Sequence, residues 1–113
     1  MKDDCVFCRI ARGDAPADVL FREADIIAFK DIHPVAPTHV LVIPVKHLES
    51  LSEAGPDDEA LLGRLMLGVR RVADELGLDG PGYRTIINTG RGAGQSVFHL
   101  HVHVMSGRRW SWP

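Results

Sequence analysis

Three histidines alternate with aliphatic residues near the end of the chain. His99, His101 and His103 stand in the run F-H-L-H-V-H-V-M. In a β-strand, successive side chains point to opposite faces, so these imidazoles would share one face, with neighbours about 6.5–7 Å apart. Burying three imidazoles for packing alone would leave ring nitrogens without partners, which costs free energy. The pattern therefore predicts a row of rings that binds a ligand or reacts.

Such a row permits two chemistries. Three strand histidines could hold zinc with a water in the fourth position. Alternatively, one imidazole could attack phosphorus while its neighbours fix its tautomer. The preceding segment, G-R-G-A-G-Q-S at 90–96, favours the second reading, because closely spaced backbone N–H groups can cradle phosphate oxygens. This loop is neither a Walker A loop, since it lacks Gly-Lys-Ser/Thr, nor a Rossmann fingerprint, since it opens a strand.

The two cysteines of the chain, Cys5 and Cys8, form a C-x-x-C pair. A disulfide between them would close a very short loop and add little stability. In a reducing compartment this spacing indicates metal or redox chemistry, with two packed small apolar residues as the alternative.

Length and charge limit the class of protein. A chain of 113 residues forms one domain, 1–113, and we expect 106–113 to be a C-terminal tail. The net charge of −2, from 13 basic and 15 acidic residues, argues against a dedicated nucleic-acid-binding protein. No apolar run approaches the ~20 residues of a membrane span, and the N-terminus lacks the apolar core of a signal peptide. We therefore expect a cytoplasmic protein without a membrane partner.

The sequence predicts an α+β fold. Leu61, Leu65, Val69, Val72 and Leu76 recur at helical spacing, so we expect a long helix from Pro56 to a stop at Gly77. The other expected elements are a short helix over 5–12, two strands within 18–31 on either side of 23–25, a loop over 33–37, and strands over 39–44, 83–89 and 97–105. Together they give a five-stranded antiparallel sheet with the long helix on one face and the short N-terminal helix beside it. The other face, or an edge, is then free for a ligand or a second subunit.

The run H-L-H-V-H-V-M resembles the His-φ-His-φ-His-φ-φ signature of the histidine-triad (HIT) superfamily, where φ is apolar. Four further stretches look like its Hint-type branch: F-C-R-I, A-F-K-D-I-H-P-V-A-P-T-H-V-L-V-I-P, N-T-G and G-Q-S. The likeness extends from Cys5 to Trp112. It implies a HIT-like fold and a nucleotide hydrolase or transferase that acts at the α-phosphorus.

The resemblance implies purine nucleoside phosphoramidates or related nucleotidyl compounds as substrates, by way of a covalent nucleotidyl-histidine intermediate. By resemblance, His101 is the nucleophile and His103 contacts phosphate oxygens. His99 would orient His101 or relay a proton, and His39 would lie behind the nucleophile.

Further residues acquire roles by the same resemblance. Gln95 and Ser96 would hold oxygens of the phosphate or leaving group, and Asp31 would accept hydrogen bonds from both ribose hydroxyls. The apolar purine walls and the remaining nucleotide contacts would be Phe7, Ile10, Phe29, Ile32, Leu41, Asn88, Gly94, Val97 and Trp112.

A structural zinc is also implied, held by Cys5, Cys8, His47 and His99, with no organic cofactor. The ligand would be a purine nucleotide such as an AMP derivative, and the assembly a homodimer. The chain departs from the branch at His33 and in its Arg/Trp-rich tail. Two other functions stay open: a nucleotide sensor or partner-binding module with little turnover, and a dinucleoside polyphosphate hydrolase.

Overall fold

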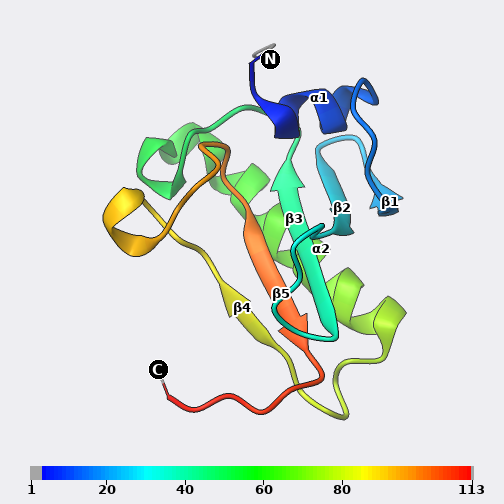
Figure 1. Cartoon of the computed structure of the whole chain (residues 1–113). Helices are drawn as coiled ribbons and strands as arrows, with labels where there is room; N and C mark the ends of the chain where they lie inside the picture. Colours follow the sequence, from blue (N-terminus) through cyan, green and yellow to red (C-terminus); the bar gives the residue numbers. More distant parts are fainter. Residues whose placement is uncertain (1–3, 113) are drawn as a thin grey trace.

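The computed structural model describes residues 4–112 and confirms the α+β fold (Figure 1). Five antiparallel strands form one sheet in the order β1-β2-β3-β5-β4. The strands are β1 (Val19–Arg22), β2 (Ile26–Lys30), β3 (Thr38–Pro44), β4 (Arg84–Ile86) and β5 (Val102–Ser106). The helices are α1 (Val6–Arg12) and α2 (Glu59–Leu76), with 3-10 turns η1 (Leu51–Glu53), η2 (Pro56–Asp58) and η3 (Arg91–Ala93).

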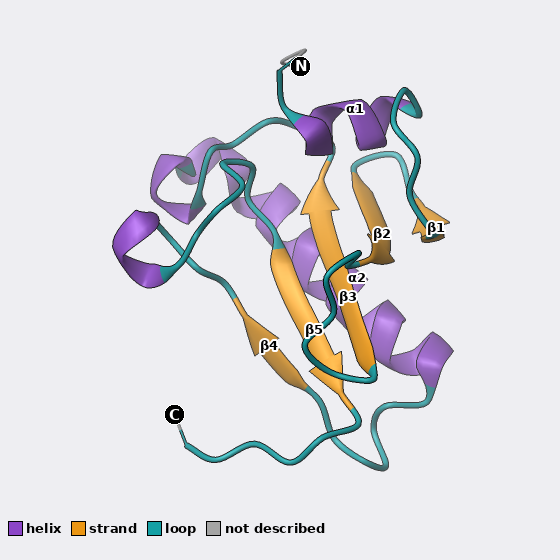
Figure 2. Ribbon diagram, viewed as in Figure 1, coloured by secondary structure: helices purple, strands orange, loops and turns teal. Residues whose placement is uncertain are grey.

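The long helix α2 covers one face of the sheet (Figure 2). Its side chains at Leu61, Leu65, Val69 and Val72 are buried as predicted, whereas Leu76 at the last turn is 40% exposed and lies outside the core. The helix lies close to the sheet: a Cβ at Gly68 would come within 3.1 Å of Ile26 and Val42 side chains. The prediction of the long helix and of its stop at Gly77 is therefore confirmed, whereas the prediction that Leu76 belongs to the buried face is wrong.

The opposite face of the sheet has its own apolar cluster, which lies under α1. The helix ends at Gly13, whose φ of 83° lies in the left-handed region that glycine favours. The clustered residues come from α1, β2 and β3: Phe7, Ile10, Ile27, Phe29, Leu41 and Ile43. Because α1 covers one end of this face and α2 lies on the other side, the rest of the face is available for a ligand.

Two strands are shorter than predicted. The expected strand over 83–89 pairs only at 84–86, and the expected strand over 97–105 begins at Val102. Val42 pairs with Val102, so Leu100 would stand opposite Pro44, which has no N–H to donate. The Leu100 N–H donates instead to the Leu48 carbonyl at 2.7 Å. His99 and His101 therefore lie before the strand, and only His103 belongs to it.

Among residues 4–112, the helices are too short or too polar to cross a membrane.

Candidate active site and metal-ligand cluster

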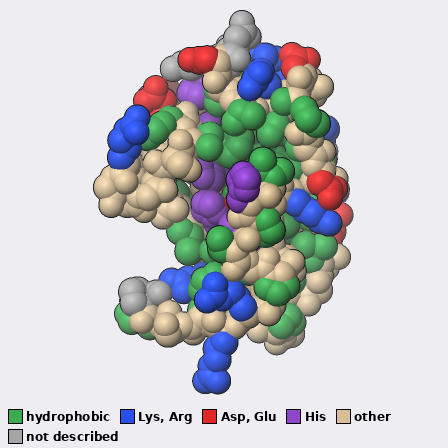
Figure 3. Space-filling model, in the orientation of Figure 1, with side chains coloured by type: hydrophobic (Ala, Val, Ile, Leu, Met, Phe, Trp, Pro, Cys, Tyr) green, Lys and Arg blue, Asp and Glu red, His purple; other side chains and the backbone are tan. Residues whose placement is uncertain are grey.

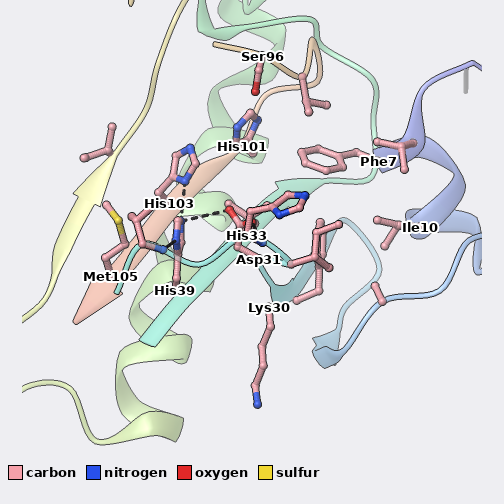
Figure 4. A pocket seen from close by; sticks show the side chains of 18 of the residues that line it. Phe7, Ile10, Lys30, Asp31, His33, His39, Ser96, His101, His103 and Met105 are labelled. Atoms are coloured by element: carbon pink, nitrogen blue, oxygen red, sulfur yellow. Dashed lines mark hydrogen bonds and ion pairs between the residues drawn. The ribbon is translucent and has the colours of Figure 1, made fainter. Parts of the chain in front are cut away.

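A pocket of about 520 Å³ opens on the sheet face opposite α2 (Figure 4). Histidine side chains are visible along a hollow on this side of the molecule (Figure 3). The lining brings together most of the predicted site residues, from α1, β2 and the loop after it, β3, β5 and the segment between β4 and β5: Phe7, Ile10, Phe29, Asp31, Ile32, His39, Leu41, Asn88, Ser96, Val97, His101 and His103.

Some predicted contacts do not line the pocket. Gln95 is 4% exposed and its side chain is occupied: Oε1 accepts from the Gly90 N–H at 2.8 Å, and Nε2 donates to the carbonyls of Glu49 and Val97 at 2.7 and 3.0 Å. Gln95 therefore stabilises the loop at 90–96. Its side-chain amide is not available to bind a ligand oxygen in the pocket. Gly94 and Trp112 are also absent from the lining, and Trp112 is 95% exposed.

His101 lines the pocket with a defined tautomer. Its Nδ1–H donates to the His99 carbonyl at 2.7 Å, because a carbonyl oxygen can only accept. In the neutral ring, Nε2 therefore carries the lone pair. Burial lowers the pKa of His101, which favours this neutral form. The ring packs edge-on against Phe7, with centroids 5.2 Å apart.

A chain of hydrogen bonds fixes the next two imidazoles. The Val35 N–H donates to His39 Nδ1 at 3.1 Å, so neutral His39 carries its proton on Nε2. That Nε2 lies 2.9 Å from His103 Nδ1 and 3.3 Å from Asp31 Oδ2. We expected His39 behind His101, but its ring contacts His103. The sheet register explains this, because His39 and His103 come from the paired strands β3 and β5.

These contacts leave His103 as a neutral hydrogen-bond donor. Since its Nδ1 accepts from His39, its proton lies on Nε2. Burial, together with neighbouring His101 and His39, lowers the pKa of His103 to about 4. At neutral pH the ring carries no charge and can offer one N–H to an oxygen of a ligand.

Asp31, from the loop after β2, also contacts this chain of hydrogen bonds. One carboxylate oxygen faces His39, and the other accepts from the His33 N–H at 2.8 Å. The His33 side chain is exposed at the pocket mouth, while the Lys30 side chain points away from the histidines (Figure 4). Asp31 therefore both caps its own loop and presents a carboxylate to the pocket.

A second cluster lies beneath α1, where Cys5, Cys8, His47 and His99 bring their ligand atoms within 4.8 Å of one another. His47 Nδ1 and His99 Nδ1 are 3.2 Å apart, and Cys8 Sγ lies 3.2 and 3.5 Å from them. In tetrahedral zinc, bond lengths of about 2.3 Å to sulfur and 2.0–2.1 Å to nitrogen require ligand separations of about 3.3–3.8 Å. The three distances among Cys8, His47 and His99, and the 3.4 Å from Cys5 Sγ to His99 Nδ1, lie close to that spacing.

The orientation of His99 also suits a cation. Its Nε2–H donates to the Pro44 carbonyl at 2.8 Å, so the Nδ1 lone pair faces the cysteines. His99 thus points away from the pocket, and the three histidines do not form one row. This finding contradicts a catalytic zinc held by His99, His101 and His103.

The sequence patterns missed several pocket residues. Val35 acts through its backbone N–H, for which side-chain chemistry gives no signal. Ile86 and Met105 line the pocket because β4 and β5 place them beside His103 and His39. Strand pairing identifies these two positions, and the pairing is a property of the folded chain.

Known proteins share this fold and sequence. A family model described as "HIT domain" matches residues 12–110. Protein HitA of Neisseria gonorrhoeae is 48% identical over 103 residues, covering 91% of this chain and 95% of HitA. A HIT family hydrolase of Legionella pneumophila Philadelphia 1 is 43% identical, with a TM-score of 0.94, covering 97% of this chain and 98% of that one.

A zinc-bound histidine triad family protein of Mycobacterium smegmatis is 37% identical, with a TM-score of 0.76, covering 93% of this chain and 76% of that one. The likeness to these proteins extends over nearly the whole chain and includes the fold as well as the sequence. The chain belongs to the HIT family.

Proposed function

We propose that this protein is a nucleotide hydrolase of the Hint-like branch, acting at the α-phosphorus of purine nucleoside phosphoramidates or related nucleotidyl compounds. The observation that carries the proposal is the pair of defined imidazole tautomers in one pocket. His101 presents an Nε2 lone pair, and His103 presents an N–H. The Legionella relative, described as a hydrolase, supports turnover over simple binding.

The first step is attack by His101 Nε2 on the α-phosphorus. A phosphorus–nitrogen bond to His101 forms while the bond from phosphorus to the leaving group breaks, and the leaving amine takes up a proton from solvent. The Nδ1–H of His101 stays on the His99 carbonyl, which stabilises the positive charge that develops on the ring. The product of this step is a nucleotidyl-histidine.

Water completes the cycle. It attacks the same phosphorus, its proton goes to solvent, the bond to His101 breaks, and the nucleoside monophosphate leaves. The sum consumes one water and one phosphoramidate and releases one amine and one monophosphate. In both steps the negative charge on the phosphate oxygens is met by the His103 N–H and by donors such as the Ser96 hydroxyl.

The nucleoside would occupy the apolar end of the pocket. Phe7 and Phe29 pack edge-on with centroids 5.4 Å apart and, with Ile10 and Leu41, offer flat apolar surface for a purine. Asp31, an acceptor, would take the ribose hydroxyls. This placement explains why the apolar walls and the imidazoles belong to one cavity.

The test compares turnover of adenosine 5′-phosphoramidate by the wild type and by His101→Ala. We expect the variant to lose turnover and still bind AMP, measured by calorimetry. Equal turnover in both proteins would remove His101 from the mechanism. AMP binding without measurable turnover by the wild type would favour the sensor alternative.

We also propose that Cys5, Cys8, His47 and His99 hold a structural zinc. The donor set fits, with two sulfurs and two ring nitrogens at suitable separations, and the Mycobacterium relative is described as zinc-bound. A zinc ion with four protein ligands has no open position, so it would supply stability by tying α1 to the sheet. Metal analysis of the purified wild type and of Cys5→Ser tests this, and absence of metal from both samples would refute it.

The remaining expectations form part of the same proposal. The protein would be cytoplasmic and a homodimer, with β4 as the edge strand that is free to pair. Light scattering during size-exclusion chromatography distinguishes a mass near 12.4 kDa, for the monomer, from twice that value.

A further inference from the structure

Gln95 is a buried amide that stands directly before Ser96 in the chain and is not part of the pocket lining. Its oxygen accepts from the Gly90 N–H, and its nitrogen donates to the carbonyls of Glu49 and Val97. The orientation of the amide is fixed, because a backbone N–H can only donate and a carbonyl can only accept. One side chain therefore joins three separate pieces of backbone.

The glycine-rich loop at 90–96 is closed on itself by the same residue. The Gly90 N–H donates to Gln95 Oε1 at 2.8 Å, and the Gln95 N–H donates back to the Gly90 carbonyl at 3.1 Å. The Ala93 N–H also donates to the Gly90 carbonyl, at 3.2 Å, and the Gly94 N–H donates to the next carbonyl at 2.9 Å. These backbone N–H groups are occupied within the loop, so they are not available for the phosphate cradle that the sequence suggested.

A short piece of backbone before η1 anchors both the loop and the histidines. The Leu48 carbonyl accepts from the Leu100 N–H at 2.7 Å, and Leu100 directly precedes His101. The next carbonyl, that of Glu49, accepts from Gln95 Nε2 at 2.7 Å. Two adjacent carbonyls therefore fix the nucleophile proposed for the reaction and the end of the glycine-rich loop relative to each other.

The position of Ser96 relative to His101 matters for the chemistry. Figure 4 shows the Ser96 oxygen directed toward the His101 ring, and both side chains line the pocket. A donor stabilises charge in the transition state when it lies about 2.7–3.1 Å from the oxygen that bears the charge. A displacement of about 1 Å can lower the rate on the order of 100-fold. The amide that holds the residue before Ser96 is therefore placed to affect the rate.

We propose that Gln95 is a positioning residue of the hydrolase. Its amide ties the glycine-rich loop to the Glu49 carbonyl, so that the Ser96 hydroxyl donates to a phosphate oxygen when the α-phosphorus lies at His101. Gln95 itself touches no substrate. The apolar walls proposed for the base, such as Phe7, come from other elements and do not need this anchor. This inference rests on the proposed function.

The first experiment is a double-mutant cycle in kcat/KM for adenosine 5′-phosphoramidate. Gln95→Met keeps the length of the side chain and removes its hydrogen bonds. We expect kcat/KM to fall about tenfold or more in this variant, as for the loss of one hydrogen bond to a charged oxygen. In a Ser96→Ala background the same substitution should change kcat/KM by less than about twofold, because the hydroxyl that Gln95 positions is already absent.

The matched control is Ser106→Ala. Ser106 is 3% exposed, and its hydroxyl donates to the Gly82 carbonyl at 2.6 Å, so this variant loses a buried hydrogen bond to a carbonyl outside the pocket. We expect a lower melting temperature with kcat/KM within about twofold of the wild type. A purely structural role of Gln95 would lower kcat/KM by the same factor with and without the Ser96 hydroxyl.

Equal factors in the two backgrounds, or unchanged kcat/KM in Gln95→Met, would overturn the proposal. If Gln95→Met does not fold, Gln95→Glu replaces it at neutral pH. A carboxylate keeps the acceptor for the Gly90 N–H and lacks the two donors for the carbonyls of Glu49 and Val97.

Calorimetry then separates this inference from the proposed function, because it needs no turnover. It compares the affinities of AMP and adenosine, which differ only in the phosphate. We expect Gln95→Met to lower the ratio of the two affinities at least about fivefold and Ser106→Ala to leave it unchanged. An unchanged ratio in Gln95→Met would refute the positioning role. A lowered ratio in a protein whose wild type shows no turnover would refute the hydrolase and leave the role of Gln95 in phosphate binding intact.

Discussion

The prediction that most directly tests the hydrogen-bond chain is the replacement of His39 by alanine. His39 is 7% exposed, and its ring joins three groups: the Val35 N–H, His103 Nδ1 and Asp31 Oδ2. If the chain sets the tautomer of His103, its removal lowers kcat even though His39 need not contact the substrate.

The magnitude follows from the bond that is lost. Without His39, the His103 Nδ1 at 2.9 Å loses its donor, and the ring is free to turn or to move its proton to Nδ1. An unpaired buried polar group costs about 1–3 kcal/mol. If that cost is expressed in the transition state, kcat falls roughly 5- to 150-fold, because about 1.4 kcal/mol corresponds to a factor of ten.

The assay is steady-state turnover of adenosine 5′-phosphoramidate between pH 5 and 8, with His39→Gln as the conservative comparison. A glutamine amide offers two N–H groups, one for His103 and one for Asp31, so we expect it to restore kcat to within about tenfold of the wild type. Thermal unfolding of each variant controls for loss of fold. Equal kcat in wild type and His39→Ala, or a glutamine variant as impaired as the alanine variant in folded protein, would refute the reasoning.

Three other outcomes follow from the structure. His103 has a pKa of about 4 in the folded protein against an ordinary 6.5, so the unfolded chain binds this proton first. As pH falls from 6.5 to 4, urea unfolding should therefore show stability decreasing by up to about 3 kcal/mol more in wild type than in His103→Gln, and parallel curves would contradict this. Gly107→Ala should lower the melting temperature by several degrees, because φ 93° and the Pro37 contact disfavour a side chain, whereas the exposed Gly63→Ala should not. Chelation by EDTA at elevated temperature should lower the melting temperature of wild type and leave that of Cys5→Ser unchanged; equal shifts in both would argue against the cysteine cluster as the metal site.

The elements of the fold with strong local signals were predictable. The apolar spacing from Leu61 to Val72 and the glycine at Gly77 located α2, and Gly13 located the end of α1. These features depend on the intrinsic backbone preferences and side-chain periodicity of short segments. The start of β5 was not predictable in this way, because Pro44, 59 positions before His103, lies where the pairing of β5 with β3 would otherwise continue.

The candidate site divides in the same way. The sequence by itself predicted imidazole and thiol chemistry, from the residue types and spacing of His99, His101, His103, Cys5 and Cys8. Burying such polar side chains without partners costs free energy, so their clustering indicates a site. The alternating pattern placed the three histidines in one row, but the tertiary structure divides them: His99 turns toward the cysteines, whereas the other two face the pocket. The orientation of His99 depends on the Pro44 carbonyl, and the tautomer of His103 depends on His39. Both partners lie far away in the sequence and come close only in the folded chain, so no local pattern encodes them.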